Sequence, residues 1–118
     1  MDRAASIVLK DLCNLSDAQA KFHWQPFRQG VEIYRLYGDE TNGPAAALLK
    51  YDPGADIPLH HHTGYEHILV LAGSQSDDQA EYDQGTLIIS KPGSGHSVTS
   101  TSGCIVLAIW NSPVEFAP

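Results

Sequence analysis

The sequence has few cysteines, few basic residues and no long hydrophobic run. Its two cysteines, Cys13 and Cys104, lie far apart and form no Cys-x-x-Cys pair, so neither a disulfide framework nor a cysteine zinc site is indicated. We therefore expect a reduced, cytoplasmic setting, with Cys104 as a small buried residue among apolar neighbours. The apolar stretch 4–9 is too short for a signal-peptide core or a membrane span, so no membrane association is expected.

Positive charge is also scarce. Seven Lys and Arg residues stand against 14 Asp and Glu residues, which gives a formal net charge of −7 at pH 7. Such a surface repels a phosphate backbone, so binding of nucleic acid is not expected. The basic residues after position 22 are Arg28, Arg35, Lys50 and Lys91, and no two of them are close in the sequence. A binding site for phosphorylated sugars is therefore disfavoured.

A length of 118 residues with 42% hydrophobic residues fits a single domain with its own core. Short segments rich in β-branched and aromatic residues alternate with Gly, Pro, Asp and Asn, a pattern that predicts an all-β barrel or sandwich. A capping-box pattern at 16–19 allows a turn or two of helix, and 24–30 is interpreted as an irregular approach to the first long strand. The predicted strands are residues 7–9, 31–37, 45–51, 59–62, 66–72, 79–82, 86–90, 96–99 and 105–110.

Several predicted strands are apolar on both faces, notably at 68–71, 87–89 and 105–110. An antiparallel sheet with one wet face would alternate instead, so the second apolar face must be covered. We expect the N-terminal segment, residues 1–23, to pack on the outside of a barrel formed by residues 24–118. A homodimer would cover the same face equally well. The two kinds of cover can coexist, and we expect a homodimer as well.

The segment 54–73 carries the residues with metal-binding chemistry. Side chains alternate along a strand, so His60 and His62 share one face and His61 points the other way. The following Thr-Gly-Tyr turn lets Glu66, at the start of the next strand, come back beside the two histidines. Two imidazoles and a carboxylate on one inward face suit a divalent transition metal, and a cation would offset the cost of burying that carboxylate.

A fourth ligand should come from a strand that crosses nearby. His96 follows a turn-rich Pro-Gly-Ser-Gly stretch and is favoured over His23, which sits in the irregular N-terminal part. By strand alternation, His61 and His67 are predicted to be surface or interface residues. The pair Asp77-Asp78 is interpreted as the tip of a hairpin, because nothing nearby would complete a calcium site.

The spacing of Gly54, His60, His62, Glu66 and Gly73 resembles the first sequence motif of the cupin superfamily without a gap. The second motif is partly present, as Gly85, Pro92, Gly95 and His96, with Ser100 where an Asn is usual. Over residues 24–112 this variant is similar to the cupin domains of ChrR-type anti-sigma factors. The segments that carry the likeness are Glu66, 69–73, Ser76-Asp77, Gly85-Thr86, 92–96 and Gly103-Cys104.

The resemblance implies a small double-stranded β-helix, the cupin or jelly-roll barrel, as a single domain. It also implies one divalent metal ion, Zn, Fe(II), Mn or Ni, on His60, His62, Glu66 and His96. The helical sigma-binding domain of ChrR has no counterpart in the sequence, so anti-sigma activity is not implied. Catalytic residues beyond the metal ligands are not predicted, since no nucleophile–base pair is evident.

Two functions from different classes follow. Zinc is usually saturated by four protein ligands, which favours a stand-alone metal-binding cupin with a small-molecule binding or sensing role. Iron(II), manganese or nickel takes about six ligands, so the same four residues would leave two positions for an oxygenated substrate. The alternative is therefore a metal-dependent dioxygenase of the acetylacetone-cleaving type. A sugar-nucleotide isomerase ranks last, because cations for phosphate are few.

Overall fold

The computed structural model describes residues 5–15, 22–39 and 41–116, and within them the backbone forms ten β-strands and no helix. No helix among these residues therefore has the length and apolar character needed to traverse a bilayer. The strands are β1 (Gln25–Arg28), β2 (Val31–Tyr37), β3 (Ala45–Tyr51), β4 (Ala55–His62), β5 (Glu66–Ser76), β6 (Glu81–Asp83), β7 (Leu87–Ser90), β8 (Gly95–Ser100), β9 (Cys104–Trp110) and β10 (Val114–Phe116).

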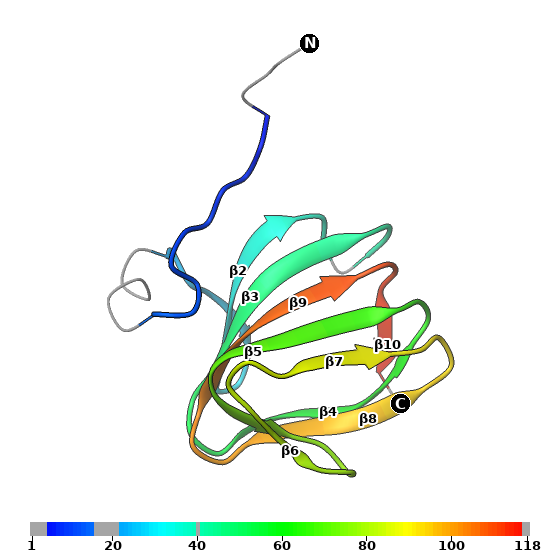
Figure 1. Cartoon of the computed structure of the whole chain (residues 1–118). Helices are drawn as coiled ribbons and strands as arrows, with labels where there is room; N and C mark the ends of the chain where they lie inside the picture. The colour runs from blue at the N-terminus through cyan, green and yellow to red at the C-terminus, as the bar shows by residue number, and fades with distance from the viewer. Residues whose placement is uncertain (1–4, 16–21, 40, 117–118) are drawn as a thin grey trace.

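The strands form one curled antiparallel sheet whose two layers face each other (Figure 1). Their order is β1-β2-β3-β9-β5-β8-β4-β10, with β6 and β7 both paired to β5. The 11-residue β5 connects the layers, because its first half pairs with β9 and β7 while its end pairs with β6 and β8. The predicted all-β barrel is confirmed, as a half-barrel in a single domain.

The long strands agree with the sequence interpretation, and the predicted ranges 31–37 and 45–51 coincide with β2 and β3. The predicted strand at 7–9 is wrong, because this stretch is irregular and its Ile7 and Val8 side chains are 60% and 69% exposed. An apolar segment becomes a strand only where a neighbouring strand accepts its hydrogen bonds, and none does so here. The predicted helical turn at 16–19 lies outside the described residues.

Two short strands were not predicted. The region 24–30 contains β1, which is an edge strand and so tolerates Pro26 without losing a ladder hydrogen bond. At the other edge of the sheet, β10 pairs with β4 and places Val114 opposite His62 and Phe116 opposite His60. The two edge strands therefore flank the part of the barrel that carries the predicted metal ligands.

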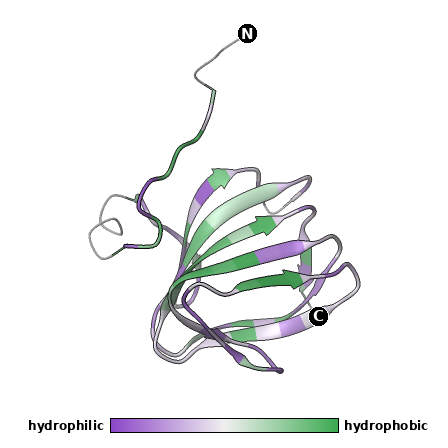
Figure 2. Cartoon of the chain, viewed as in Figure 1, coloured by the Kyte–Doolittle hydropathy of each residue, from purple (hydrophilic) through white to green (hydrophobic). Residues whose placement is uncertain are grey.

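Apolar side chains form one cluster on each face of the larger layer, which explains the strands that are apolar on both faces. Figure 2 shows the hydrophobic residues along the strands of this layer. The inner cluster fills the barrel with residues such as Ile33, Val70 and Val106, each at most 1% exposed. The outer cluster centres on Leu48 and Ile105. Three leucines of the N-terminal stretch join this outer cluster, namely Leu9, Leu12 and Leu15. Leu15 is 4% exposed, so these contacts remove apolar surface from water.

The two glycines that bound the first motif have conformational reasons to be glycine. Gly54 and Gly73 adopt positive φ angles of 84° and 71°, where a side chain is strained. A Cβ atom on Gly73 would also collide with the carbonyl oxygen of Gly103 on the neighbouring turn. Gly54 therefore belongs to the turn that precedes β4, whereas Gly73 lies within β5, just after the register shift between Val70 and Ala72, where the backbone passes close to Gly103.

Candidate metal centre

Four side chains converge inside the barrel from three strands. Along β4, His60 and His62 are buried and the intervening His61 is exposed, as strand alternation requires. His96 on β8 is the direct cross-strand partner of His60, and Glu66 is the first residue of β5. One ligand atom from each of these four residues lies within 4.8 Å of all the others. The four predicted residues are thus brought together and could hold a metal ion.

The hydrogen bonds of the first two imidazoles fix which ring nitrogen faces inward. His60 Nδ1 lies 2.9 Å from the carbonyl oxygen of Pro58, which can only accept, so this nitrogen is the donor. His62 Nδ1 lies 2.9 Å from Ser94 Oγ, whose own hydrogen is donated to the Lys91 carbonyl oxygen at 2.5 Å. The serine therefore accepts from His62. In both neutral rings the remaining nitrogen, Nε2, carries the lone pair that a metal requires.

His96 has a carboxylate in the corresponding place. Its Nδ1 lies 3.7 Å from Asp77 Oδ2, a distance for an electrostatic contact and not for a hydrogen bond. The Asp77 side chain is only 11% exposed, so its attraction for the ring is weakly screened. A negative group on this side favours a proton on Nδ1, and the Nε2 atoms of all three imidazoles are then available as ligands.

The inward atoms are close together but do not satisfy one another. His62 Nε2 lies 3.1 Å from Glu66 Oε1, and His96 Nε2 lies 3.7 Å from the same oxygen. Despite the short distance, His62 Nε2 is fully buried and has no hydrogen-bond partner in the described part of the chain. A buried lone pair that faces a carboxylate oxygen is unfavourable unless a cation lies between them. The donor set therefore fits a divalent transition metal.

The Glu66 carboxylate is held in its charged form. Burial alone would raise its pKa, but the neighbouring His62 and His96 and a hydrogen bond from Trp110 outweigh burial and lower the pKa below its ordinary value. The Trp110 indole donates from Nε1 to Glu66 Oε2 over 2.7 Å. The two residues are cross-strand partners in β5 and β9, which brings the indole beside the carboxylate. Because the indole binds Oε2, the other carboxylate oxygen, Oε1, faces the histidines.

Two of the imidazoles are biased toward the neutral, metal-binding form. Burial lowers the pKa of His60 and of His96, and the nearby Glu66 carboxylate opposes this only in part. At neutral pH these rings are therefore unprotonated, with a lone pair available. The centre thus combines uncharged nitrogen donors with one charged oxygen donor in a buried position.

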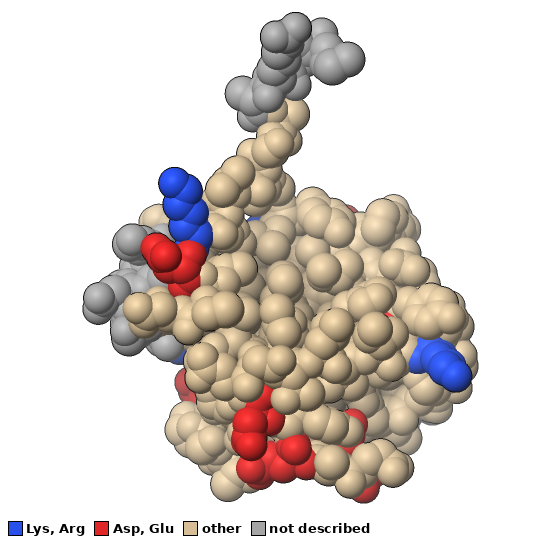
Figure 3. All heavy atoms as spheres, in the orientation of Figure 1, with Lys and Arg blue, Asp and Glu red and all other residues tan. Residues whose placement is uncertain are grey.

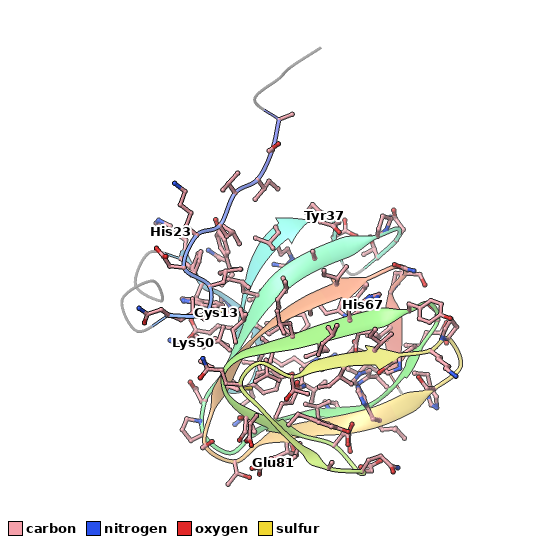
Figure 4. All side chains as sticks on the ribbon, viewed as in Figure 1. Cys13, His23, Tyr37, Lys50, His67 and Glu81 are labelled. Atoms are coloured by element: carbon pink, nitrogen blue, oxygen red, sulfur yellow. The ribbon has the colours of Figure 1, made fainter. Side chains whose placement is uncertain are left out.

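The other predicted positions are also resolved. His23 is not part of the cluster and lies beside the N-terminal stretch, outside the barrel (Figure 4). His67 points outward from β5, so strand alternation excluded it and His61 correctly. Cys104 is 6% exposed within the inner cluster, as expected for a small buried residue.

Three supporting residues were missed by sequence reasoning. Asp77 does belong to a hairpin tip, between β5 and β6, yet its carboxylate faces His96. Ser94 and Trp110 hold His62 and Glu66. Ser94 could have been found from its position in the sequence, because it stands two residues before His96 in the turn that leads to β8. Trp110 gave no local signal, since its contact depends on the pairing of β9 with β5.

An all-β half-barrel with three histidines and one glutamate gathered on its inner face defines a cupin. The family model for the ChrR cupin-like domain matches residues 15–114, and the chain belongs to this family.

Known proteins agree with this assignment. The chain is 34% identical over 96 residues to the anti-sigma-E factor ChrR of Cereibacter sphaeroides, which covers 79% of this chain and 44% of that protein. The solved complex of Rhodobacter sphaeroides SigE with the anti-sigma ChrR aligns with a TM-score of 0.65 and 30% identity, over 75% of this chain and 48% of that one. The chain thus spans less than half the length of either relative.

A third similarity concerns the fold alone. An acetylacetone dioxygenase from Acinetobacter johnsonii aligns with a TM-score of 0.77 over 100% of this chain and 82% of its own, at 14% identity. The same architecture therefore accommodates very different sequences.

Proposed function

We propose that this protein binds one divalent transition-metal ion through His60, His62, Glu66 and His96 and uses it to hold a small oxygenated molecule inside the barrel. The observation that carries the proposal is a set of three imidazoles whose Nδ1 atoms face acceptors, two of which, His62 and His96, direct Nε2 at the Glu66 carboxylate. Structural histidines in a core usually use both nitrogens for hydrogen bonds. A centre arranged in this way is built for a cation.

Space for a bound molecule supports the second half of the proposal. A cavity of about 40 Å³ is lined by His60, Glu66 and His96 and by apolar residues of the inner cluster. Zinc would be saturated by the four side chains, whereas iron(II), manganese or nickel would leave positions for a ligand that enters this cavity. When bound, such an ion would act as a Lewis acid and as a template for oxygen donors.

The residues of the chain would contribute orientation and exclusion of water. Pro58, Ser94 and Asp77 face the Nδ1 atoms of the three imidazoles and keep each ring in one orientation. The geometry of the candidate ligands is therefore set before a molecule arrives. Trp110 holds Glu66 Oε2 and thereby keeps this carboxylate from rotating away. The apolar lining of the cavity removes competing water from a bound molecule.

A dioxygenase that acts on a small β-diketone is the second candidate. It is supported by the cavity beside the ligands and by the similarity in fold to an acetylacetone dioxygenase over the whole chain. Besides Glu66 and the two histidines, the described titratable side chain that lines this cavity is Tyr51, and burial raises the pKa of its phenol well above the ordinary value, so it stays protonated and is not a base at neutral pH. This chemistry would therefore depend on the metal itself, and only an iron-loaded protein would display it.

Elemental analysis of protein purified without a histidine tag tests the first proposal, with one metal ion per chain as the expected result. The variant His62→Ala should lose the metal and some thermal stability together, because binding to the folded form adds to the free energy of unfolding. His61→Ala is the matched control, since His61 is exposed on the same strand, and it should retain the metal. Substoichiometric metal after reconstitution of the wild type would contradict the proposal.

The dioxygenase candidate has its own measurement. Oxygen uptake by the iron(II)-loaded protein with acetylacetone should depend on both the iron and His62. Flat oxygen uptake across β-diketones by fully loaded protein would remove this candidate and leave the binding role intact.

We also propose that a second copy of the chain covers the outer face of β7, β5 and β9. Leu87 and Ile89 are 55% and 54% exposed there, and Ile89, His67 and Ile109 are aligned across the three strands. In Figure 3 the middle of this face is uncharged and the charged side chains lie at its margins, so a two-fold contact centred on Leu87 and Ile89 would bury mainly uncharged surface.

Sedimentation tests this association at micromolar concentration. The wild type should sediment as a dimer and Ile89→Lys as a monomer with unchanged metal content. Leu59→Lys is the matched control, because Leu59 is 46% exposed on β4 in the other layer and should not affect association. A monomeric wild type would contradict the proposed dimer.

A further inference from the structure

A second and larger cavity adjoins the metal-site cavity. It has a volume of about 240 Å³ and is lined mainly by the ends of β1, β2, β3, β9 and β10. Four of its lining residues, Phe27, Trp110, Val114 and Phe116, also line the 40 Å³ cavity at the metal ligands. The two cavities therefore share a wall formed by these four side chains, and we infer that a molecule would reach the candidate metal centre through the larger one, which we call the entrance cavity.

The entrance cavity carries positive charge in an acidic protein. Both arginines of the described residues, Arg28 and Arg35, line it, although the chain has a net charge of −7. The one carboxylate among its described lining residues, Asp39, accepts hydrogen bonds from the hydroxyl and the backbone N–H of Thr41, which lower the pKa of Asp39, and it lies near enough to Arg35 for the Arg35 charge to lower this pKa as well. Among the described residues, the entrance cavity is therefore lined by two guanidinium groups, and Asp39 lies beside Arg35 and not beside Arg28.

A single aromatic ring, that of Phe116, lies against both Arg28 and the candidate ligand His60. The guanidinium carbon of Arg28 lies 3.8 Å from the centre of the Phe116 ring and 5.9 Å from that of Phe27. The Phe116 ring is in turn 5.5 Å from the ring of His60. No described carboxylate lies within ion-pairing distance of Arg28. A guanidinium stacked on an aromatic face keeps its in-plane N–H groups available for a planar carboxylate.

We propose that the molecule held by the metal centre carries a carboxylate that Arg28 binds, with Arg35 adding to the positive field. This inference rests on the proposed function and names its ligand class: a small monoanion with oxygen donors at one end, a short apolar body and a carboxylate at the other. The apolar body packs between Phe27, Trp110 and Phe116. The planar Arg28 guanidinium can donate two parallel hydrogen bonds to the two oxygens of a carboxylate.

A matched pair of β-diketones tests the carboxylate. The first, 4,6-dioxoheptanoate, has a chelating diketone and a carboxylate separated by two methylene groups. The second, heptane-2,4-dione, is identical except that a methyl group replaces the carboxylate. Calorimetric titration of both into wild-type protein loaded with nickel(II) should show the carboxylate binding about 10-fold more tightly, as expected for one charge-assisted hydrogen-bonded pair.

Variants assign the preference to the arginine. Arg28→Gln should reduce the affinity for 4,6-dioxoheptanoate about 10-fold and leave that for heptane-2,4-dione unchanged, and Arg28→Lys should retain part of the preference. Lys50→Gln is the control, because it removes a positive charge from a residue outside both cavities and should change neither affinity.

The outcomes separate this inference from the proposal on which it rests. Equal binding of the two diketones by the metal-loaded wild type, or a preference that survives Arg28→Gln, would overturn the carboxylate assignment and leave the metal-dependent binding role standing. Failure of both diketones to bind metal-loaded protein would overturn the proposed function itself.

Discussion

Removal of the Ser94 hydroxyl gives the sharpest test of the metal centre. Ser94 Oγ accepts from His62 Nδ1 and donates to the Lys91 carbonyl, so the hydroxyl fixes the His62 tautomer. In Ser94→Ala the ring can move its proton to Nε2, which lies 3.1 Å from Glu66 Oε1 and can then donate to that carboxylate. The metal-free protein gains a hydrogen bond that a metal ion would have to break.

The magnitude follows from what the substitution leaves in place. The backbone of the turn is tied independently, because His62 N donates to the Ser94 carbonyl and Gly93 N donates to the His62 carbonyl, each over 2.8 Å. The ligand atoms should therefore stay where they are. Loss of a partner that orients a ligating histidine typically weakens metal binding ~10–100-fold. We expect a loss in this range, with little change in the stability of the metal-free protein.

Competition with a chromophoric zinc chelator measures the affinity, and urea unfolding of metal-free protein measures the stability. Ser97→Ala is the matched control, since Ser97 lies on β8 and its hydroxyl contacts Asp78 at 3.4 Å and no ligand. Zinc affinity of Ser94→Ala within about twofold of the Ser97→Ala value would refute the argument that the tautomer is fixed.

Two further predictions concern Glu66 and pH. In Trp110→Phe the buried Glu66 carboxylate loses its 2.7 Å hydrogen bond, a loss of roughly 1.5–3 kcal/mol when the acceptor is charged. Metal affinity should therefore fall while the fold persists. Unchanged affinity in the same chelator assay would contradict this prediction. Burial lowers the pKa of His60 and His96 in the folded metal-free protein, so the unfolded chain binds more protons as the pH falls through 6.5. The stability of the metal-free protein should therefore decrease on acidification. It should decrease further below pH 4.5, because the pKa of Glu66 is lowered in the folded protein and the unfolded chain takes up this proton first. Urea midpoints of metal-free protein should fall from pH 7.5 to pH 5.5, and a higher midpoint at pH 5.5 would reverse the assigned sign.

Three of the four candidate ligands could be predicted from the sequence because their spacing is local, whereas His96, on β8, depended on a strand that crosses nearby. Alternation along one strand separates His60 and His62 from His61, and a three-residue turn brings Glu66 back. The long strands β2, β3 and β9 were predicted for a similar reason, since each is an apolar run bounded by glycine or turn residues. Neither inference needs knowledge of which strands pair.

The edge strands could not be predicted in this way, and they line the entrance cavity. The four residues of β1 and the three of β10 have no apolar periodicity, and they are strands only because β2 and β4 accept their pairing. Arg28 and Phe116 belong to these two strands and lie 88 positions apart in the sequence, yet their side chains stack. The scattered basic residues of the sequence argued against an anion site, and tertiary pairing brought two of them to one cavity.

The partners of the ligands explain why the site was easier to predict than its use. The three imidazoles are oriented by a backbone carbonyl on β4, by a serine in the turn before β8 and by an aspartate in the β5–β6 hairpin. Each is an ordinary acceptor, and none carries a sequence signature of its own. What they share is that they contact the ring nitrogen remote from the candidate metal position, and so they would determine how strongly the nitrogen donors bind a metal ion. The choice between a closed zinc site and an open one for chemistry therefore depends on these outer contacts and on the entrance cavity more than on the four ligands themselves.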